Sequence, residues 1–133
     1  MNVADIEGVG PAFAEKLEKA GGKTTDGLLK AGATAKGRKD IAAASGIAEA
    51  KILAWVNRAD LYRIKGVGSE YSDLLEVAGV DTVKELAQRK PENLLDAMTK
   101  ANADKNLVRR LPTLEAVVDW VDQAKKLPRV VEY

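Results

Sequence analysis

The sequence contains neither cysteine nor histidine among its 133 residues. Without cysteine it can form no disulfide bond and no thiolate metal site, so any metal would have to bind carboxylate and carbonyl oxygens. Without histidine it also lacks the side chain most often used for proton transfer near neutral pH. No other recognisable catalytic constellation is present. The sequence therefore predicts a protein that is not an enzyme.

Aromatic residues and long apolar runs are also scarce. Aromatic side chains make up only 5% of the chain, so its core must consist mainly of Ala, Val, Leu and Ile, which favours close-packed helices over a sheet sandwich. No apolar run approaches the roughly 20 residues that cross a bilayer. Residues 1–10 lack the basic start and apolar stretch of a signal peptide. We therefore expect a cytoplasmic protein with no membrane partner.

Basic residues show no clear excess, since 21 Lys and Arg stand against 20 Asp and Glu, for a net charge of +1. Proteins that bind nucleic acid tightly usually carry such an excess, because release of counterions from phosphate supplies much of their affinity. The near-neutral total counts against tight, charge-driven binding to DNA. Local basic clusters are nevertheless present at residues 36–39 (Lys-Gly-Arg-Lys), at 109–110 (Arg-Arg), and at 125–126 (Lys-Lys) with Arg129.

The chain repeats itself. Residues 6–28 read IEGVGPAFAEKLEKAGGKTTDGL, and residues 64–86 read IKGVGSEYSDLLEVAGVDTVKEL, an offset of 58 (64 minus 6). A second echo pairs residues 52–56 (ILAWV) with 117–121 (VVDWV) at an offset of 65 (117 minus 52). Internal similarity at a fixed offset indicates repeated structural units. We predict two tandem units, residues 1–60 and 61–133, with no flexible linker between them.

Local signals within each unit predict helices. A Gly-Val-Gly turn precedes each apolar stripe, and an Ala-Gly pair ends it. Thr82 to Glu85 has the form of a capping box that opens a further helix. We also expect helices over residues 39–44 and 48–62, one opened by Pro91, and one capped by Thr113. Trp55 and Trp120 fall in apolar stripes and are expected to be core residues. The tail, residues 128–133, is β-prone but solitary, and either packs across the helices or adds to a partner's sheet edge.

The shared pattern Ile-x-Gly-Val-Gly-x-x-x-(Ala/Ser)-x-x-Leu-x-x-Ala-Gly resembles the helix-hairpin-helix element. That element occurs in DNA-repair and recombination proteins and in the C-terminal domain of the bacterial RNA polymerase alpha subunit. The tandem form, with its trailing Gly-x-x-Thr, most resembles an uncharacterised bacterial family of paired helix-hairpin-helix proteins. The resemblance implies an all-α fold in which two pseudo-repeated helix-hairpin-helix units pack as one compact helical domain.

The resemblance also implies a function. In DNA-binding relatives the hairpin lies along one strand of the minor groove, where its backbone N–H groups and the following helix N-terminus contact phosphate. A monovalent cation held by hairpin carbonyls often assists; no other cofactor is expected. Glycines let the backbone approach, and unpaired amides attract an anion. Such contacts read no bases, so binding to duplex DNA would be independent of sequence. The residues implied are Gly8, Val9 and Gly10 in the first hairpin, and Gly66, Val67 and Gly68 in the second.

The two hairpins differ in their neighbours. Glu7 stands beside the first, where a carboxylate repels phosphate, and Pro11 removes an amide from its helix start. The second is flanked by Lys65, with Arg63 nearby and Ser69 able to donate to phosphate. Glu70 and Asp73 follow closely, but the second hairpin is still the better candidate.

The alternative function is a protein–protein interaction adaptor in which the hairpins are purely structural. A Gly-Val-Gly turn is also a compact way to join two helices. Charge geometry distinguishes the two readings. DNA binding predicts that Arg63, Lys65 and another basic cluster share one face, whereas an adaptor requires no such convergence.

Overall fold

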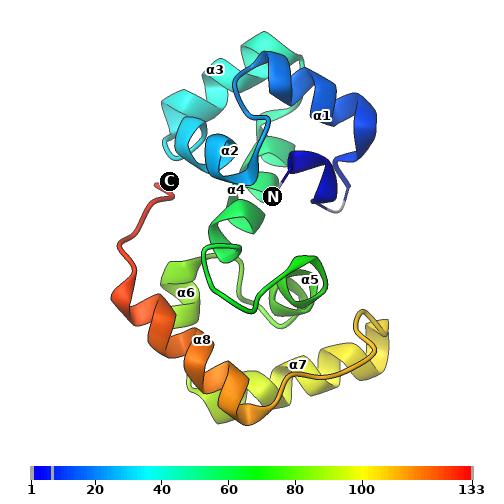
Figure 1. Cartoon of the computed structure of the whole chain (residues 1–133), viewed down its shortest axis with the longest axis vertical. Coiled ribbons are helices and arrows are strands. Elements are labelled where there is room, and N and C mark those ends of the chain that lie inside the picture. Colours follow the sequence, from blue (N-terminus) through cyan, green and yellow to red (C-terminus); the bar gives the residue numbers. More distant parts are fainter. Residues whose placement is uncertain (1, 7, 133) are drawn as a thin grey trace. The chain divides into compact units, whose positions relative to one another are not determined.

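The computed structural model describes residues 2–6 and 8–132, and this part of the chain is all-helical (Figure 1). It contains no strand in the described ranges, only a single bridge between Asn2 and Thr24. The predicted all-α fold class is therefore confirmed. Glu7 lies outside the described residues. The elements in chain order are η1 (Val3–Asp5), α1 (Gly10–Lys19), α2 (Thr25–Ala31), α3 (Ala35–Ser45), α4 (Glu49–Leu61), α5 (Ser69–Val77), α6 (Val83–Ala87), α7 (Pro91–Lys105) and α8 (Leu114–Lys126).

The chain divides into two compact units. Unit 1 comprises Met1–Asp60 together with Arg129–Tyr133, and unit 2 comprises Leu61–Pro128. Unit 1 contains η1, α1 to α3 and all of α4 except its last residue, whereas α5 to α8 belong to unit 2. Residues 129–132, which we call the tail segment, thus group with unit 1, although the helix before them belongs to unit 2.

In unit 1, α1 packs against η1 and α3, and α2 packs against α3. The core is aliphatic and includes Val3, Ile6, Leu17, Leu28, Ile52 and Val56, all with at most 1% of their surface exposed. Helix α3 begins at Ala35 and not at the predicted residue 39, because the Thr34 hydroxyl accepts a hydrogen bond from the Gly37 N–H at 3.0 Å. This side-chain cap satisfies an amide that would otherwise lack a partner, and so extends the helix by one turn.

In unit 2, α8 packs against both α6 and α7, and α5 packs against α7. The core residues Leu74, Leu75, Leu86, Leu94, Met98 and Val117 are fully buried. Helix α7 begins at Pro91 and the Thr113 hydroxyl caps α8, both as predicted. The capping box of α6 is displaced by one residue. Thr82 accepts from the Glu85 N–H as predicted, but the Glu85 carboxylate accepts from the N–H of Asp81, the residue before the cap.

Candidate functional site

The two hairpins use the same local bonds. The Val9 N–H donates to the Ile6 carbonyl at 3.1 Å, and the Val67 N–H donates to the Ile64 carbonyl at 3.2 Å. Both valine side chains are buried, at 2% and 5% exposure. The valine amides are therefore already engaged within the turns. What each hairpin leaves exposed is its first glycine, Gly8 or Gly66.

A buried tryptophan lies behind each of these glycines. Gly8 and Gly66 have φ of +88° and +98°, a region that side chains other than glycine rarely adopt. A Cβ atom added at Gly8 would lie 3.9 Å from Trp55 Nε1, but one added at Gly66 would lie only 2.9 Å from Trp120 Nε1. Trp55 and Trp120 are 6% and 3% exposed, so the expectation that they are core residues is confirmed.

Each tryptophan also contacts the aromatic ring at the start of the following helix. The centroids of Phe13 and Trp55 are 5.4 Å apart, and those of Tyr71 and Trp120 are 5.2 Å apart, with interplanar angles of 54° and 53°. These are the separations and tilts that aromatic pairs favour. The glycine, the aromatic ring and the tryptophan thus form a similar local arrangement at both hairpins.

The side chain of Gln123 in α8 binds the main chain of the second hairpin through two hydrogen bonds. The Lys65 N–H donates to Gln123 Oε1 at 2.9 Å, and Gln123 Nε2 donates to the Lys65 carbonyl at 3.1 Å. The Gln123 amide is itself oriented by Asp119, whose carboxylate accepts from Nε2 at 2.8 Å. The main chain of Lys65 is fixed by this pair of bonds, while its side chain stays exposed. Gln123 could not be identified from the sequence, because its partner Lys65 lies 58 residues away.

A pocket of about 290 Å³ opens beside the second hairpin. The Tyr71 hydroxyl donates to the Arg110 carbonyl at 3.0 Å, which fixes the segment between α7 and α8 against this edge of unit 2. One of the predicted basic clusters, residues 109–110, therefore meets the second hairpin. The pocket is lined by Gly66, Tyr71, Arg110, Leu111, Pro112, Thr113, Ala116 and Trp120.

The first hairpin has a different neighbour on its aromatic ring. Residues 46–48 join α3 to α4, whereas the longer segment 106–113 joins α7 to α8 and supplies the pocket wall. At the offset of 65, Lys51 is the counterpart of Ala116. The Lys51 ammonium lies 4.9 Å from the centroid of the Phe13 ring. A lysine thus lies over the ring at the first hairpin, where the second hairpin has an alanine and an open pocket.

The remaining predicted residues of the second hairpin are placed as follows. Arg63 donates from Nη2 to the Pro128 carbonyl at 2.7 Å, so its guanidinium is engaged with the end of unit 2. Ser69 is the first residue of α5, and its cap residue Gly68 offers no side-chain acceptor to the first turn. Glu70 is exposed in that turn, and Asp73 is buried. Lys65 and Arg110 are the exposed cations at this hairpin that the structure places beside Gly66.

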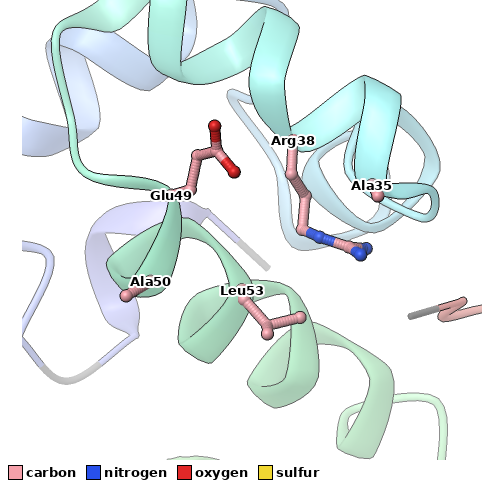
Figure 2. A pocket seen from close by; sticks show the side chains of 5 residues that line it. All are labelled: Ala35, Arg38, Glu49, Ala50 and Leu53. Carbon is pink, nitrogen blue, oxygen red and sulfur yellow. The ribbon is translucent and has the colours of Figure 1, made fainter.

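A second pocket, also of about 290 Å³, lies in unit 1 and is lined by Ala35, Arg38, Glu49, Ala50 and Leu53 (Figure 2). Arg38 belongs to the local basic cluster at residues 36–39. Its side chain is only 6% exposed, and Nη1 donates to the Gly32 and Ala33 carbonyls at 2.8 and 3.1 Å. The cluster is therefore not a continuous basic surface. Its arginine is a structural residue of the unit 1 interior.

Two kinds of feature are absent from residues 2–6 and 8–132, the ranges that the structure describes. Within these ranges no group of three or more carboxylates is placed to hold a metal ion. No helix in the same ranges combines the length and apolar character needed to cross a bilayer.

Comparison with known proteins gives one assignment. The family model described as "Domain of unknown function (DUF4332)" matches residues 7–127. Searches of curated proteins and of solved structures each returned no significant match. Because the matched range covers most of the sequence, the chain belongs to the DUF4332 family.

Proposed function

We propose that the protein is a non-enzymatic binding module that holds the phosphate backbone of duplex DNA through unit 2, without sequence specificity. The observation that carries this proposal is the position of Arg110, which lines one pocket with Gly66 of the second hairpin. An exposed glycine lets a phosphate approach the main chain, and an arginine that lines the same pocket can offer two parallel donors to the same anion.

We further propose that the two units are pseudo-repeated helix-hairpin-helix elements. Support comes from the matched hydrogen bonds of Val9 and Val67, and from the similar placement of Trp55 and Trp120 behind Gly8 and Gly66. These pairs are also equivalent in the sequence, the valines and glycines at the offset of 58 and the tryptophans at 65.

The two hairpins do not share the binding role equally. The first has a lysine over its aromatic ring. It also has a proline in the first turn of α1, and proline has no backbone N–H to donate to a phosphate. We assign it an architectural role. The second carries Lys65 and Arg110, whose two charges imply weak binding. At about −0.9 per neutralised phosphate, they give a slope of roughly −1.8 for log affinity against log salt concentration.

A monovalent cation is compatible with the second hairpin but is not required by the proposal. The carbonyl oxygens of Ile64 and Lys65 each accept one hydrogen bond. Each retains a second lone pair, and oxygen donors of this kind suit such an ion. The ion would add positive charge next to the phosphate.

Fluorescence anisotropy with labelled duplexes of unrelated sequence, measured over a salt series, tests the proposal. We expect similar affinities for all duplexes and a loss of binding as salt rises that follows the slope of roughly −1.8. Arg110→Gln and Lys65→Gln should each weaken binding to every duplex and make the slope shallower by about 0.9. Lys51→Gln, which removes one positive charge at the first hairpin, is the matched control and should leave binding unchanged.

Absence of binding at low salt would refute the proposal, as would an equal loss with Lys51→Gln. Absence of binding would instead favour the adaptor reading, in which both hairpins are purely structural. An equal loss with Lys51→Gln would show that binding is not confined to unit 2.

A further inference from the structure

The buried guanidinium of Arg38 holds main-chain groups from two distant parts of unit 1. Beyond its bonds to Gly32 and Ala33, its Nη2 donates to the Glu132 carbonyl at 2.6 Å. These acceptors are all main-chain carbonyls. An arginine fork can serve several of them at once, and they compensate the loss of hydration of the buried charge.

The tail segment is held in unit 1 through its main chain. The Glu132 N–H donates to the Ala33 carbonyl at 2.7 Å, while its own carbonyl accepts from Arg38. Both main-chain groups of this residue are therefore paired, although its side chain is exposed. Val131 supplies the anchor, with only 3% of its surface exposed. We call the Ala33 carbonyl, the Arg38 guanidinium and the site of the Val131 side chain the tail seat.

This pattern of contacts is that of a peptide-recognition site. Main-chain bonds supply affinity regardless of sequence, and one apolar side chain supplies specificity. Among the tail's described residues, 129–132, only Val131 is buried, and none of them lies in a helix or strand. Segments with so few buried contacts are among the first to open in a folded protein.

The pocket next to the tail seat has room that the tail does not fill. Arg38 belongs to both, and in Figure 2 its side chain and that of Glu49 project from α3 and α4 on either side of the pocket, with Leu53 below. Because the Arg38 fork is engaged with carbonyls, Glu49 is the charged group of this pocket that remains exposed. A ligand with a basic side chain can pair with it.

We propose that the tail seat is a docking site for an extended segment of a protein partner, and that the tail occupies it in cis until that partner displaces it. The partner segment has a β-branched apolar residue at the position of Val131 and a basic residue that reaches Glu49. The tail is tethered to the chain, so its effective concentration is in the millimolar range. The partner segment can compete with it because its basic residue adds a contact to Glu49. This site is independent of the nucleic-acid function proposed for unit 2.

The experiment uses the full chain with Val131→Asp, which removes the anchor of the tail while leaving the seat intact. The probe is a fluorescent synthetic peptide with the sequence of residues 127–133, and the control peptide carries Asp in place of Val131. We expect the variant chain to bind the probe at least tenfold more tightly than the wild-type chain does, because the competing tail has been released. The control peptide should bind at least tenfold more weakly than the probe.

Two further measurements test the chemistry of the seat. Two variants of the probe peptide carry Lys in place of Glu132 or in place of Tyr133. At least one of them should bind several-fold more tightly than the probe. Glu49→Gln in the chain should abolish that gain. Arg38→Lys keeps the positive charge but loses the planar guanidinium, which can serve several carbonyls at once. It should lower the affinity for the probe peptide several-fold, while circular dichroism shows that the helices are intact.

A folded Val131→Asp chain that binds neither peptide, or binds both equally, would overturn the proposal. So would a wild-type chain that is dimeric by light scattering and becomes monomeric with Val131→Asp. That result would assign the seat to the tail of a second copy.

Discussion

Alanine substitution should cost the second hairpin more stability than the first. Both Gly8 and Gly66 have positive φ, and placing a Cβ there costs about 1–2 kcal/mol. At Gly66 the new atom would also lie 2.9 Å from Trp120 Nε1, compared with 3.9 Å from Trp55 at Gly8. Forcing an extra carbon against a buried ring typically costs a further 1–3 kcal/mol or so. We therefore expect losses of about 1–2 kcal/mol for Gly8→Ala and about 2–5 kcal/mol for Gly66→Ala.

Urea denaturation followed by circular dichroism measures both losses in the free energy of unfolding. A thermal melt offers a second readout, because in a unit of this length each 1 kcal/mol lowers the Tm by about 4–8 °C. A double-mutant cycle with Trp120→Phe isolates the contact, because phenylalanine lacks the ring nitrogen that Cβ would meet. The excess cost of Gly66→Ala over Gly8→Ala should shrink in that background. Equal losses at the two glycines, or an excess that survives in Trp120→Phe, would refute the reasoning.

Three other predictions concern unit 2. Thr113→Ala removes the side-chain acceptor of the α8 cap and should lower the free energy of unfolding by about 1 kcal/mol, measured by urea denaturation. Met98→Ala empties a fully buried site and should cost about 2–5 kcal/mol in the same assay. Burial, followed by repulsion from Glu85, raises the pKa of Asp81 above its ordinary 3.8. The folded chain then holds this proton more tightly than the unfolded chain, so the stabilising contribution is present below pH 3.8 and is lost as pH rises through the raised value. Asp81→Asn should therefore be more stabilising relative to wild type at neutral pH than near pH 4, and a pH series of melts that shows no such trend would contradict this assignment.

Features encoded within a few residues of sequence were predictable. The starts of α7 and α8 follow from Pro91 and Thr113, because a cap or a missing N–H acts within one helical turn. The core positions of the two tryptophans follow from helical periodicity, which also depends only on residues close in sequence. Helix α3 is longer than predicted because the Thr34 hydroxyl caps it before the predicted start at residue 39.

Features that depend on distant partners were not predictable. Arg38 stands in a run of basic residues that locally resembles a solvated surface, yet its partner Glu132 lies 94 residues away. Gln123 carries no motif and is defined only by its bonds to Lys65. Arg63 is expected near the hairpin from its place in the sequence, but the hydrogen bond that it donates to the Pro128 carbonyl, 65 residues away, could not be predicted. Single-sequence patterns carry no information on such pairings.

The grouping of the tail segment with unit 1 also has a consequence for the order of folding. Unit 2 is continuous in sequence, whereas unit 1 consists of two segments that flank it along the chain, as in a host domain with an inserted domain. During synthesis the first 60 residues emerge early, but the carbonyl that Arg38 binds arrives only with residue 132. Every residue of unit 2 has been synthesised by Pro128. Because domains generally fold as units while the chain emerges, the inserted unit can reach its final contacts before its host does.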